Sequence, residues 1–482
     1  MSHDIKKHLT RRQLLASGAY GFCGYLVAPG ILSMLTDQVA FGACAATGTG
    51  AQANRKASFL VFDLAGGGNI AGNNVMVGRE DDQRKALPVG AYRTLGLPDA
   101  LHPGDTTRWV AEFGLLFHSQ SAMLAGLMEV TTPATRANVD GIVFAAKSAD
   151  DTENNPHNPV HWIARAGLVG DLVPLIGTQN SPSGGRSASP ASSIDPANRP
   201  ITIARPQDVG LIVDKGKLAT LLKPNEAEAV LKAAQAMSAE KLKLFNEKTL
   251  SSQVKELVDC GYLQSVELLT KFSAEALNPA NDQQVVNANT GAFKDFAANE
   301  LARRTASVAK TVIEGYAGAG TIVLGGYDYH EAIKSDQEKK EREAGRLIGQ
   351  ALELARIKQQ DLMIYVCSDG AVGANGQMDA ATGKYRFSGD SGDRGAAFIL
   401  VYKKDGKPTV LKDGRQIGSY KDNGAVQTDS SLISGEVENL AKAVVLNYMA
   451  LNGTERDFAK VVGADPFGTN LDRYKLFGKL RG

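Results

Sequence analysis

The sequence is poor in the side chains that most often carry chemistry. Its 482 residues include only four cysteines, seven histidines and two tryptophans. Four cysteines in a chain of this length exclude a disulfide-stabilised scaffold, and seven histidines leave few imidazoles for a typical zinc site. Lys and Arg (53) nearly balance Asp and Glu (52). The near-neutral balance excludes a global positive field that would attract nucleic acid.

The first 45 residues have the features of an export signal. Arg11 and Arg12 precede an uncharged stretch, residues 14–36, which is moderately apolar and contains five glycines or prolines. This pattern is typical of the twin-arginine route, and residues 43–45 fit a cleavage site. The alternative is an uncleaved membrane anchor, because the stretch is long enough to span a bilayer. We expect export to the periplasm or cell envelope of a bacterium, with membrane contact only through an uncleaved signal or a lipidated Cys44.

The rest of the chain predicts a linker at residues 46–56 and one α/β domain at 57–482. Apolar runs that do not alternate predict buried strands at 57–64, 321–324, 362–367 and 396–402. Helical spacing predicts helices at 334–358 and 436–451 and a helical region at 225–315. Residues 109–128 read as a helix, a turn and a strand, and the Ser-rich residues 180–198 as an exposed loop. The alternation of strands and helices indicates a mainly parallel sheet covered on both faces.

Polar residues gather where the predicted strands end. Asp63 lies near the end of one strand, Asp328 and His330 follow a second, and Asp369 follows a third. In parallel sheets, ligands bind beyond the carboxyl ends of the strands. This arrangement predicts one site built from several strand ends.

Asp328, His330, Asp369 and Asp63 are the predicted ligands of one divalent metal, Zn, Mn or Ca. Carboxylate and imidazole groups suit such ions, and residues two apart in an extended loop point the same way. Structural alternatives stay open for two of them. Asp63 could accept hydrogen bonds from the glycine loop at 66–68, and Asp328 could cap the following helix.

A hydroxyl nucleophile is predicted at residues 131–136. Thr132 or Thr135 could attack, with Arg136 beside them to bind a phosphate or sulfate. The structural alternative is a Thr-Pro turn that caps a helix.

Taken in order, these stretches resemble one known family along nearly the whole chain. The matching pieces are residues 62–78, 101–103, 123–138, 161–165, 325–330, 368–370, 393–395, 414–418 and 428–429. Together with the Arg-Arg start they are similar to the family called domain of unknown function 1501, a sulfatase-like branch of the alkaline-phosphatase superfamily. The resemblance implies a three-layer α/β/α sandwich with a mainly parallel sheet, a helical insert, and a pocket that can hold metal at the strand ends.

The chain departs from the family pattern at the expected ligands. Asn69 stands where the family has Asp, Ala137 and Asn138 where it has Ser-His, and Arg394 where it has His. Enzymes of the superfamily use Asp and His ligands with a Ser, Thr or modified Cys nucleophile. The departures imply a degenerate metal site, in which Arg394, Asn69 and Asn138 bind an anion instead.

Three functions stay open at this point. The first is an exported, sulfatase-like envelope protein with a degenerate metal site that binds an anion or another protein. The second is a metal-dependent hydrolase of phosphate or sulfate esters. The third is a structural component of a secretion or surface assembly that contacts envelope proteins through residues 225–315.

Overall fold

The computed structural model describes residues 55–149, 156–212, 274–327, 329 and 334–481, together with Ala236. Residues 55–212 and 275–482 form one compact unit, which is the part described below. A second unit, residues 1–54 with 213–274, lies almost wholly outside the described residues. The predicted signal peptide, Cys44, most of the linker and, except for Ala236, residues 225–273 of the helical region therefore lie outside them, as do Asp328 and His330.

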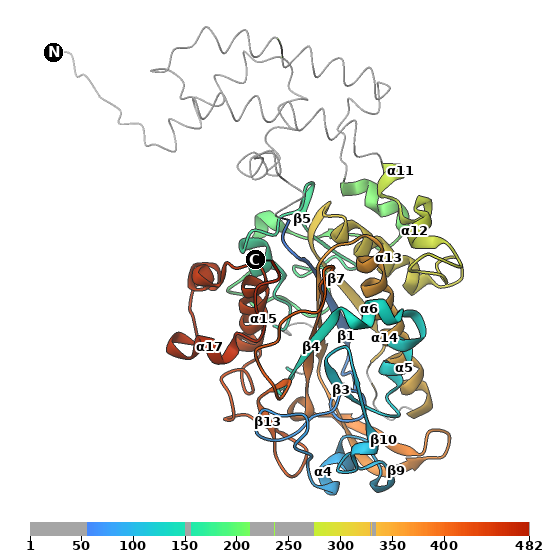
Figure 1. Cartoon of the computed structure of the whole chain (residues 1–482), viewed down its shortest axis with the longest axis vertical. Coiled ribbons are helices and arrows are strands. Elements are labelled where there is room, and N and C mark those ends of the chain that lie inside the picture. The colour runs from blue at the N-terminus through green and yellow to red at the C-terminus, as the bar shows by residue number, and fades with distance from the viewer. Residues whose placement is uncertain are drawn as a thin grey trace, which may run out of the picture. The chain divides into compact units, whose positions relative to one another are not determined.

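A sheet of eight strands forms the centre of the unit (Figure 1). Its order is β12 (Gln416–Ile417), β4 (Val139–Phe144), β11 (Ala397–Tyr402), β8 (Leu362–Asp369), β1 (Ser58–Ala65), β7 (Ala317–Gly325), β5 (Val173–Gly177) and β6 (Ile201–Thr202). Only β11 is antiparallel to its neighbours; the other pairs are parallel. The prediction of an α/β fold with a mainly parallel sheet is confirmed.

Helices cover both faces of this sheet. On one face lie α5 (Ala122–Val130), α13 (Glu300–Ile313) and α14 (Lys334–Ile357), on the right in Figure 1. On the other lie α7 (Val160–Arg165), α15 (Val437–Leu451), α16 (Phe458–Val462) and α17 (Leu471–Tyr474). Phe59 and Val61 pack in the core under α7 and α15. Because strand side chains alternate, Asp63 projects to the same face.

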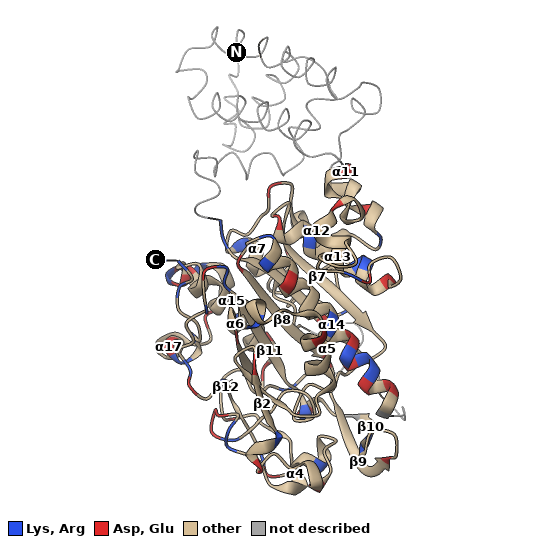
Figure 2. Cartoon of the chain, turned by 45° about the vertical axis from the view of Figure 1, so that its right-hand side comes forward, with Lys and Arg blue, Asp and Glu red and all other residues tan. Residues whose placement is uncertain are grey.

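Charged side chains lie mainly on the helices and loops, while the strands of the large sheet carry almost none (Figure 2). All eight residues of β1 and of β8 are buried. A carboxylate inside such a strand loses its hydration, so Asp63 and Asp369 need local partners. In the part of the chain that the structure describes, no helix is both long and apolar enough to cross a membrane.

The pair α5 and α14 shows how glycines allow close helix packing. A Cβ at Gly126 would lie 2.0 Å from the Arg342 carbonyl oxygen, and one at Gly345 would lie 2.0 Å from that of Met123. The two backbones thus touch directly near the middle of α14.

Several predicted elements are confirmed: the strands at β1, β7, β8 and β11, and the helices at α14 and α15. Cys367 is a buried free thiol in β8. Smaller elements are α4 (Val89–Thr94), α6 (Pro133–Ala137), α11 (Ala274–Leu277), α12 (Gln283–Val286), β13 (Ser419–Tyr420) and β14 (Val426–Gln427). Within the predicted helical region, α11, α12 and α13 are the described helices.

Three local predictions are wrong. Residues 109–128 form a hairpin, β2 (Trp109–Glu112) and β3 (Leu115–His118), before α5, because Phe113 and Gly114 both take positive φ and make a tight turn. Between β8 and β11, where the sequence predicts no strand, the chain forms a second hairpin, β9 (Val372–Asp379) and β10 (Lys384–Asp390). This hairpin returns the chain to the edge where β8 ends, so β11 runs antiparallel to β8. The third wrong prediction concerns residues 180–198, part of which packs over the strand ends described in the next section.

Candidate functional site

Two buried aspartates lie at the carboxyl ends of the adjacent strands β1 and β8. Asp63 is the Cα partner of Cys367, and Asp369 is the partner of Ala65. Asp63 is 0% exposed and Asp369 is 4% exposed. Asp63, Cys367 and Asp369 project to the same face of the sheet because they occupy alternate positions on paired strands.

The two carboxylates raise each other's cost of ionisation. Burial raises the pKa of Asp63, against the backbone N–H of Ser187, which donates to Oδ2 at 2.9 Å. Burial, and then the charge of Asp63, raises the pKa of Asp369 to about 7. The other oxygen of Asp63, Oδ1, is buried and has no hydrogen-bond partner among the described residues. Such a pair favours either a proton or a bound cation.

Asp369 also holds the glycine loop that follows β1. The N–H of Gly66 donates to its Oδ1, and the N–H of Gly68 donates to Ser368 Oγ at 2.6 Å. The Ser368 hydroxyl in turn donates to the Leu64 carbonyl at 2.9 Å. The structural role proposed for Asp63, capping this loop, thus belongs to Asp369 and Ser368, and Asp63 binds another segment.

That segment is the loop at residues 181–187, which packs over the strand ends. A Cβ on Gly185 would lie 2.6 Å from Thr321 Cγ2 and 3.2 Å from Asp63 Oδ2. Thr321 Oγ1 donates to the Ser183 carbonyl at 2.9 Å. The buried Ser183 and Ser193 donate to the Ser187 and Pro190 carbonyls, so their polarity does not require exposure. The expectation of a long exposed loop is wrong here for that reason.

Arg186 is exposed between the buried residues Gly185 and Ser187 of this loop. Its side chain is 43% exposed, whereas that of Asp369 is 2% exposed, and Nε lies 4.0 Å from Asp369 Oδ2. That separation is too long for a hydrogen bond but close enough for charge attraction. Arg186 therefore offsets part of the negative charge while facing solvent.

Ser148 bridges the two peptides that flank Asp369. Its Oγ donates to the Ser368 carbonyl at 2.7 Å and accepts from the Gly370 N–H at 2.6 Å. His157 Nε2 lies 3.1 Å from the same oxygen. Burial lowers the pKa of His157 to about 3, so its ring is neutral at pH 7. Since the Ser148 proton is directed to a carbonyl, the pattern assigns the imidazole proton to Nε2.

Asp328 and His330 lie outside the described residues, but their described neighbours belong to the same edge of the sheet. The N–H of Tyr327 donates to the Ala65 carbonyl at 3.1 Å. Tyr329 is buried, and its hydroxyl donates to Glu341 Oε1 at 3.1 Å. The bond from Tyr327 places the residue before Asp328 beside the end of β1.

The residues present fit a divalent cation in one respect. An orphaned carboxylate oxygen on Asp63, next to a second buried carboxylate, is the donor set that hard divalent ions take. The described residues contain no group of three or more His, Cys, Asp or Glu side chains arranged to hold a metal. Further ligands would have to come from Asp328, His330 or solvent.

The predicted anion-binding residues are not brought together. Asn138 follows α6 and directly precedes β4. The start of β4 lies at the opposite end of the strands from Asp369. The Asn138 side chain donates to the Lys404 carbonyl at 3.3 Å. Asn69 is buried, and its N–H donates to Glu341. Arg394 lies just before the start of β11, close to where β8 ends, and its guanidinium donates to Ser391 Oγ at 2.8 Å. These three do not form one anion site.

The predicted nucleophiles lie at the wrong edge as well. Thr135 is 0% exposed and donates to Glu353, while Thr132 caps α6 by accepting from the Thr135 N–H. Arg136 pairs with Glu112 at 3.6 Å. This is the capping alternative stated above. The structure separates all three from Asp63 and Asp369 because α6 precedes β4, whose carboxyl end, not its start, is at the site.

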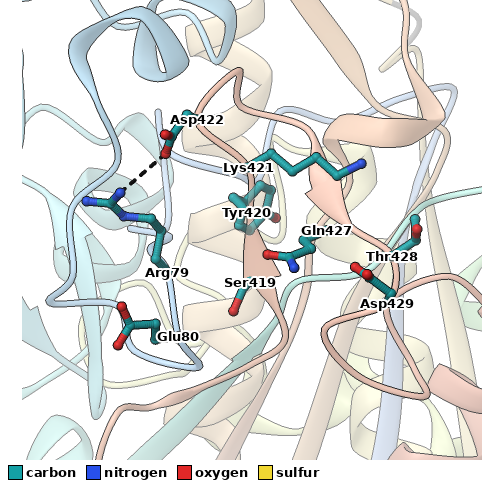
Figure 3. Close-up of a pocket in the computed structure, with 9 residues that line it drawn as sticks. All are labelled: Arg79, Glu80, Ser419, Tyr420, Lys421, Asp422, Gln427, Thr428 and Asp429. Atoms are coloured by element: carbon teal, nitrogen blue, oxygen red, sulfur yellow. Dashed lines mark hydrogen bonds and ion pairs between the residues drawn. The ribbon is translucent and has the colours of Figure 1, made fainter.

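Two surface cavities lie away from the aspartate pair. One, of about 630 Å³, is lined by Arg79, Glu80, Ser419, Tyr420, Lys421, Asp422, Gln427, Thr428 and Asp429 (Figure 3). Its charges are mixed, and Arg79 pairs with Asp422 at 3.3 Å. The other, of about 520 Å³, contains Arg136 together with Arg84, Lys407 and Arg415, each of which also pairs with a carboxylate. In both cavities positive and negative side chains form ion pairs, so the charge of the lining does not indicate a particular class of ligand.

Sequence reasoning missed Arg186, Ser148 and Ser187. A usable signal was present for the first, because the apolar run at 172–177 precedes the segment Gly184-Gly185-Arg186. A buried parallel strand followed by glycines and an arginine is a pattern that places a cation at a strand end. Ser148 carried no local signal, since its partners are distant in sequence.

No family model, curated protein or solved structure matches this chain. The fold and the site therefore define it as an α/β protein with a mostly parallel sheet and a buried carboxylate pair at the carboxyl ends of its strands.

Proposed function

We propose that this protein is an exported, sulfatase-like envelope protein that binds one divalent cation between Asp63 and Asp369 and uses it to bind a small anion. The observation that carries the proposal is the buried pair itself, in which Asp63 Oδ1 has no partner in the described part of the chain. Burial, and then repulsion from Asp63, raises the pKa of Asp369, and a bound cation would offset both by stabilising the ionised carboxylate. Asp328 and His330 would supply further ligands, and the cation would supply a positive charge for an oxyanion.

Binding is favoured over hydrolysis because two hydroxyl groups near the pair, those of Ser368 and Ser148, are committed elsewhere. Ser368 Oγ bonds both Gly68 and Leu64. Ser148 Oγ bonds the peptides on both sides of Asp369. Thr132 and Thr135 are at the opposite edge of the sheet. The three-layer sulfatase-like architecture and the export route belong to the same proposal, supported by the order of motifs along the sequence.

The test is metal binding by calorimetry with Mn²⁺, Zn²⁺ and Ca²⁺. We expect one equivalent of cation in the wild type, and affinity at least about tenfold weaker in Asp63→Asn, Asp369→Asn and Asp328→Asn. Asp429→Asn changes a carboxylate of the surface cavity and is expected to bind as the wild type does. Cation binding that is absent, or unchanged in the three variants, contradicts the proposal.

A second candidate is hydrolysis of phosphate or sulfate esters, and one observation favours it. The pKa of Asp369 is about 7, which suits a general acid or base at neutral pH. Turnover of aryl phosphate or aryl sulfate by the cation-loaded protein would support this candidate, provided that the turnover is lost in Asp369→Asn.

A further inference from the structure

We propose that Arg186 is the residue that binds the anion, and that it becomes available when the cation neutralises Asp369. The inference rests on the proposed function, since it needs a cation at the aspartate pair. It adds a residue, a ligand class and a coupling between two ligands that the pair alone does not specify. The ligand class is a tetrahedral oxyanion, such as phosphate, sulfate or one of their monoesters.

The first argument is the way Arg186 is held. Its neighbours in the loop, Gly185 and Ser187, are buried, and there is no room for a side chain at Gly185. Thr321 ties the loop to β7 through the Ser183 carbonyl, and Asn158 Nδ2 donates to Thr321 Oγ1 at 2.9 Å. A rigid loop therefore presents one exposed guanidinium at a fixed place, which lowers the entropy cost of binding.

The second argument is that the Arg186 guanidinium has few partners of its own in the described part of the chain. In the described part of the chain its single ion pair is the one to Asp369, through Nε at 4.0 Å, and its side chain makes no hydrogen bond there. Arginine presents five N–H donors in a planar fork that matches phosphate and sulfate oxygens. Arg394 differs from Arg186 in this respect, because its guanidinium already donates to Ser391 Oγ at 2.8 Å.

The third argument is the balance of charge. The two aspartates and Arg186 together leave one net negative charge when both carboxylates are ionised, which repels an anion. A divalent cation changes this to one net positive charge and removes the attraction between Asp369 and Arg186. The guanidinium can then face a doubly charged anion that also contacts the cation. Cation and anion should therefore bind with positive cooperativity, and the coupling must be reciprocal.

The experiment is calorimetric titration of sulfate and phosphate into the full protein with and without saturating Mn²⁺. We expect anion affinity to rise at least about tenfold with Mn²⁺ in the wild type, and sulfate to tighten Mn²⁺ binding by the same factor. Arg186→Gln should lose about tenfold in anion affinity, whereas its Mn²⁺ affinity in the absence of anion should be equal or higher, because the guanidinium no longer competes for Asp369. Arg186→Lys should fall between them, because it keeps the charge and loses the fork.

Arg394→Gln is the matched control, an arginine at the same edge of the sheet, and should bind both ligands as the wild type does. Unchanged anion affinity in Arg186→Gln, with Mn²⁺ still bound, overturns the role of Arg186 and leaves the proposed function intact. Mn²⁺ binding that is absent from the wild type overturns the proposed function and this inference together. An aryl sulfate titrated beside free sulfate distinguishes an ester ligand from the free anion, and acetate of equal affinity overturns the tetrahedral class.

Discussion

The Oγ of Ser148 lies 3.1 Å from Nε2 of His157, and both side chains are buried where β4 and β8 end. A serine beside a histidine has the residue types of a nucleophile and its general base, but the hydrogen bonds here are not those of such a pair. The serine proton is directed to the Ser368 carbonyl, and the imidazole is neutral with Nε2 as the donor. The two residues fix the peptides that flank Asp369, so they act as positioning residues for its carboxylate.

The first prediction follows from this contact. Ser148→Ala should weaken cation affinity by about tenfold, because residues that hold a ligand in place typically contribute that much. The change should appear by calorimetry with Mn²⁺, together with a shift in the pH at which binding is half complete. Ser193→Ala is the matched control, a buried serine whose hydroxyl donates to the Pro190 carbonyl at 2.7 Å. Equal Mn²⁺ affinity in the two variants would show that Ser148 does not position Asp369.

The second prediction concerns the dependence of stability on pH without metal. Asp369 has its pKa raised to about 7, so the folded state binds more protons than the unfolded state between about pH 4 and pH 7. The contribution of Asp369 to the free energy of unfolding should therefore fall as pH rises through this window, whereas the contribution of His157, whose pKa burial lowers to about 3, rises there. Denaturant titration in the presence of a chelator, compared between the wild type and Asp369→Asn, isolates the Asp369 contribution.

Relative to the wild type, Asp369→Asn should gain stability as pH rises from about 4 to 7, and its free energy of unfolding at pH 8 should be higher by about 1 kcal/mol or more, because the variant lacks a buried charge beside Asp63. The loss of the Arg186 attraction is small by comparison, since that pair is partly exposed and long. A variant that is less stable than the wild type at pH 8 would contradict the assigned repulsion.

The third prediction concerns the loop over the pair. Gly185→Ala would place a Cβ 2.6 Å from Thr321 Cγ2 and 3.2 Å from Asp63 Oδ2, so the loop must shift. We expect about 1–3 kcal/mol of lost stability and weaker cation binding. Gly389→Ala in β10 is the control, because a Cβ there meets nothing within 4 Å. Thermal unfolding of both variants tests whether the tight packing at Gly185 is the cause.

The fourth prediction concerns the threonines that the sequence marked as nucleophiles. Thr132→Ala removes the cap of α6 and should cost about 1 kcal/mol of stability. Thr135→Val removes a buried bond to Glu353, which keeps its pair with Arg356 at 2.7 Å, and should cost about 1–2 kcal/mol. Neither change should affect cation or anion affinity. A variant that folds normally but loses anion binding or turnover would restore these threonines to the site.

Much of the fold could be predicted because its strands are buried on both faces. β1, β7 and β8 are long apolar runs, and α14 separates charged from apolar residues at helical spacing. Hairpins were harder to predict. The turn at Phe113 and Gly114 carries no Asn-Gly signal, although both residues have positive φ, and β9 is exposed along most of its length. Without a buried face, β9 shows no clear pattern of apolar residues.

The sequence by itself determined the parallel sheet and the position of Asp63 and Asp369 at strand ends, because both depend on local apolar runs and their boundaries. Only the tertiary structure decided which polar residues meet there. It brings Ser148, His157 and Arg186 to the pair from loops that follow different strands, and it leaves Thr135 and Asn138 at the opposite edge. The physical reason is that strand order and direction, which no local pattern encodes, determine which loops share an edge of the sheet.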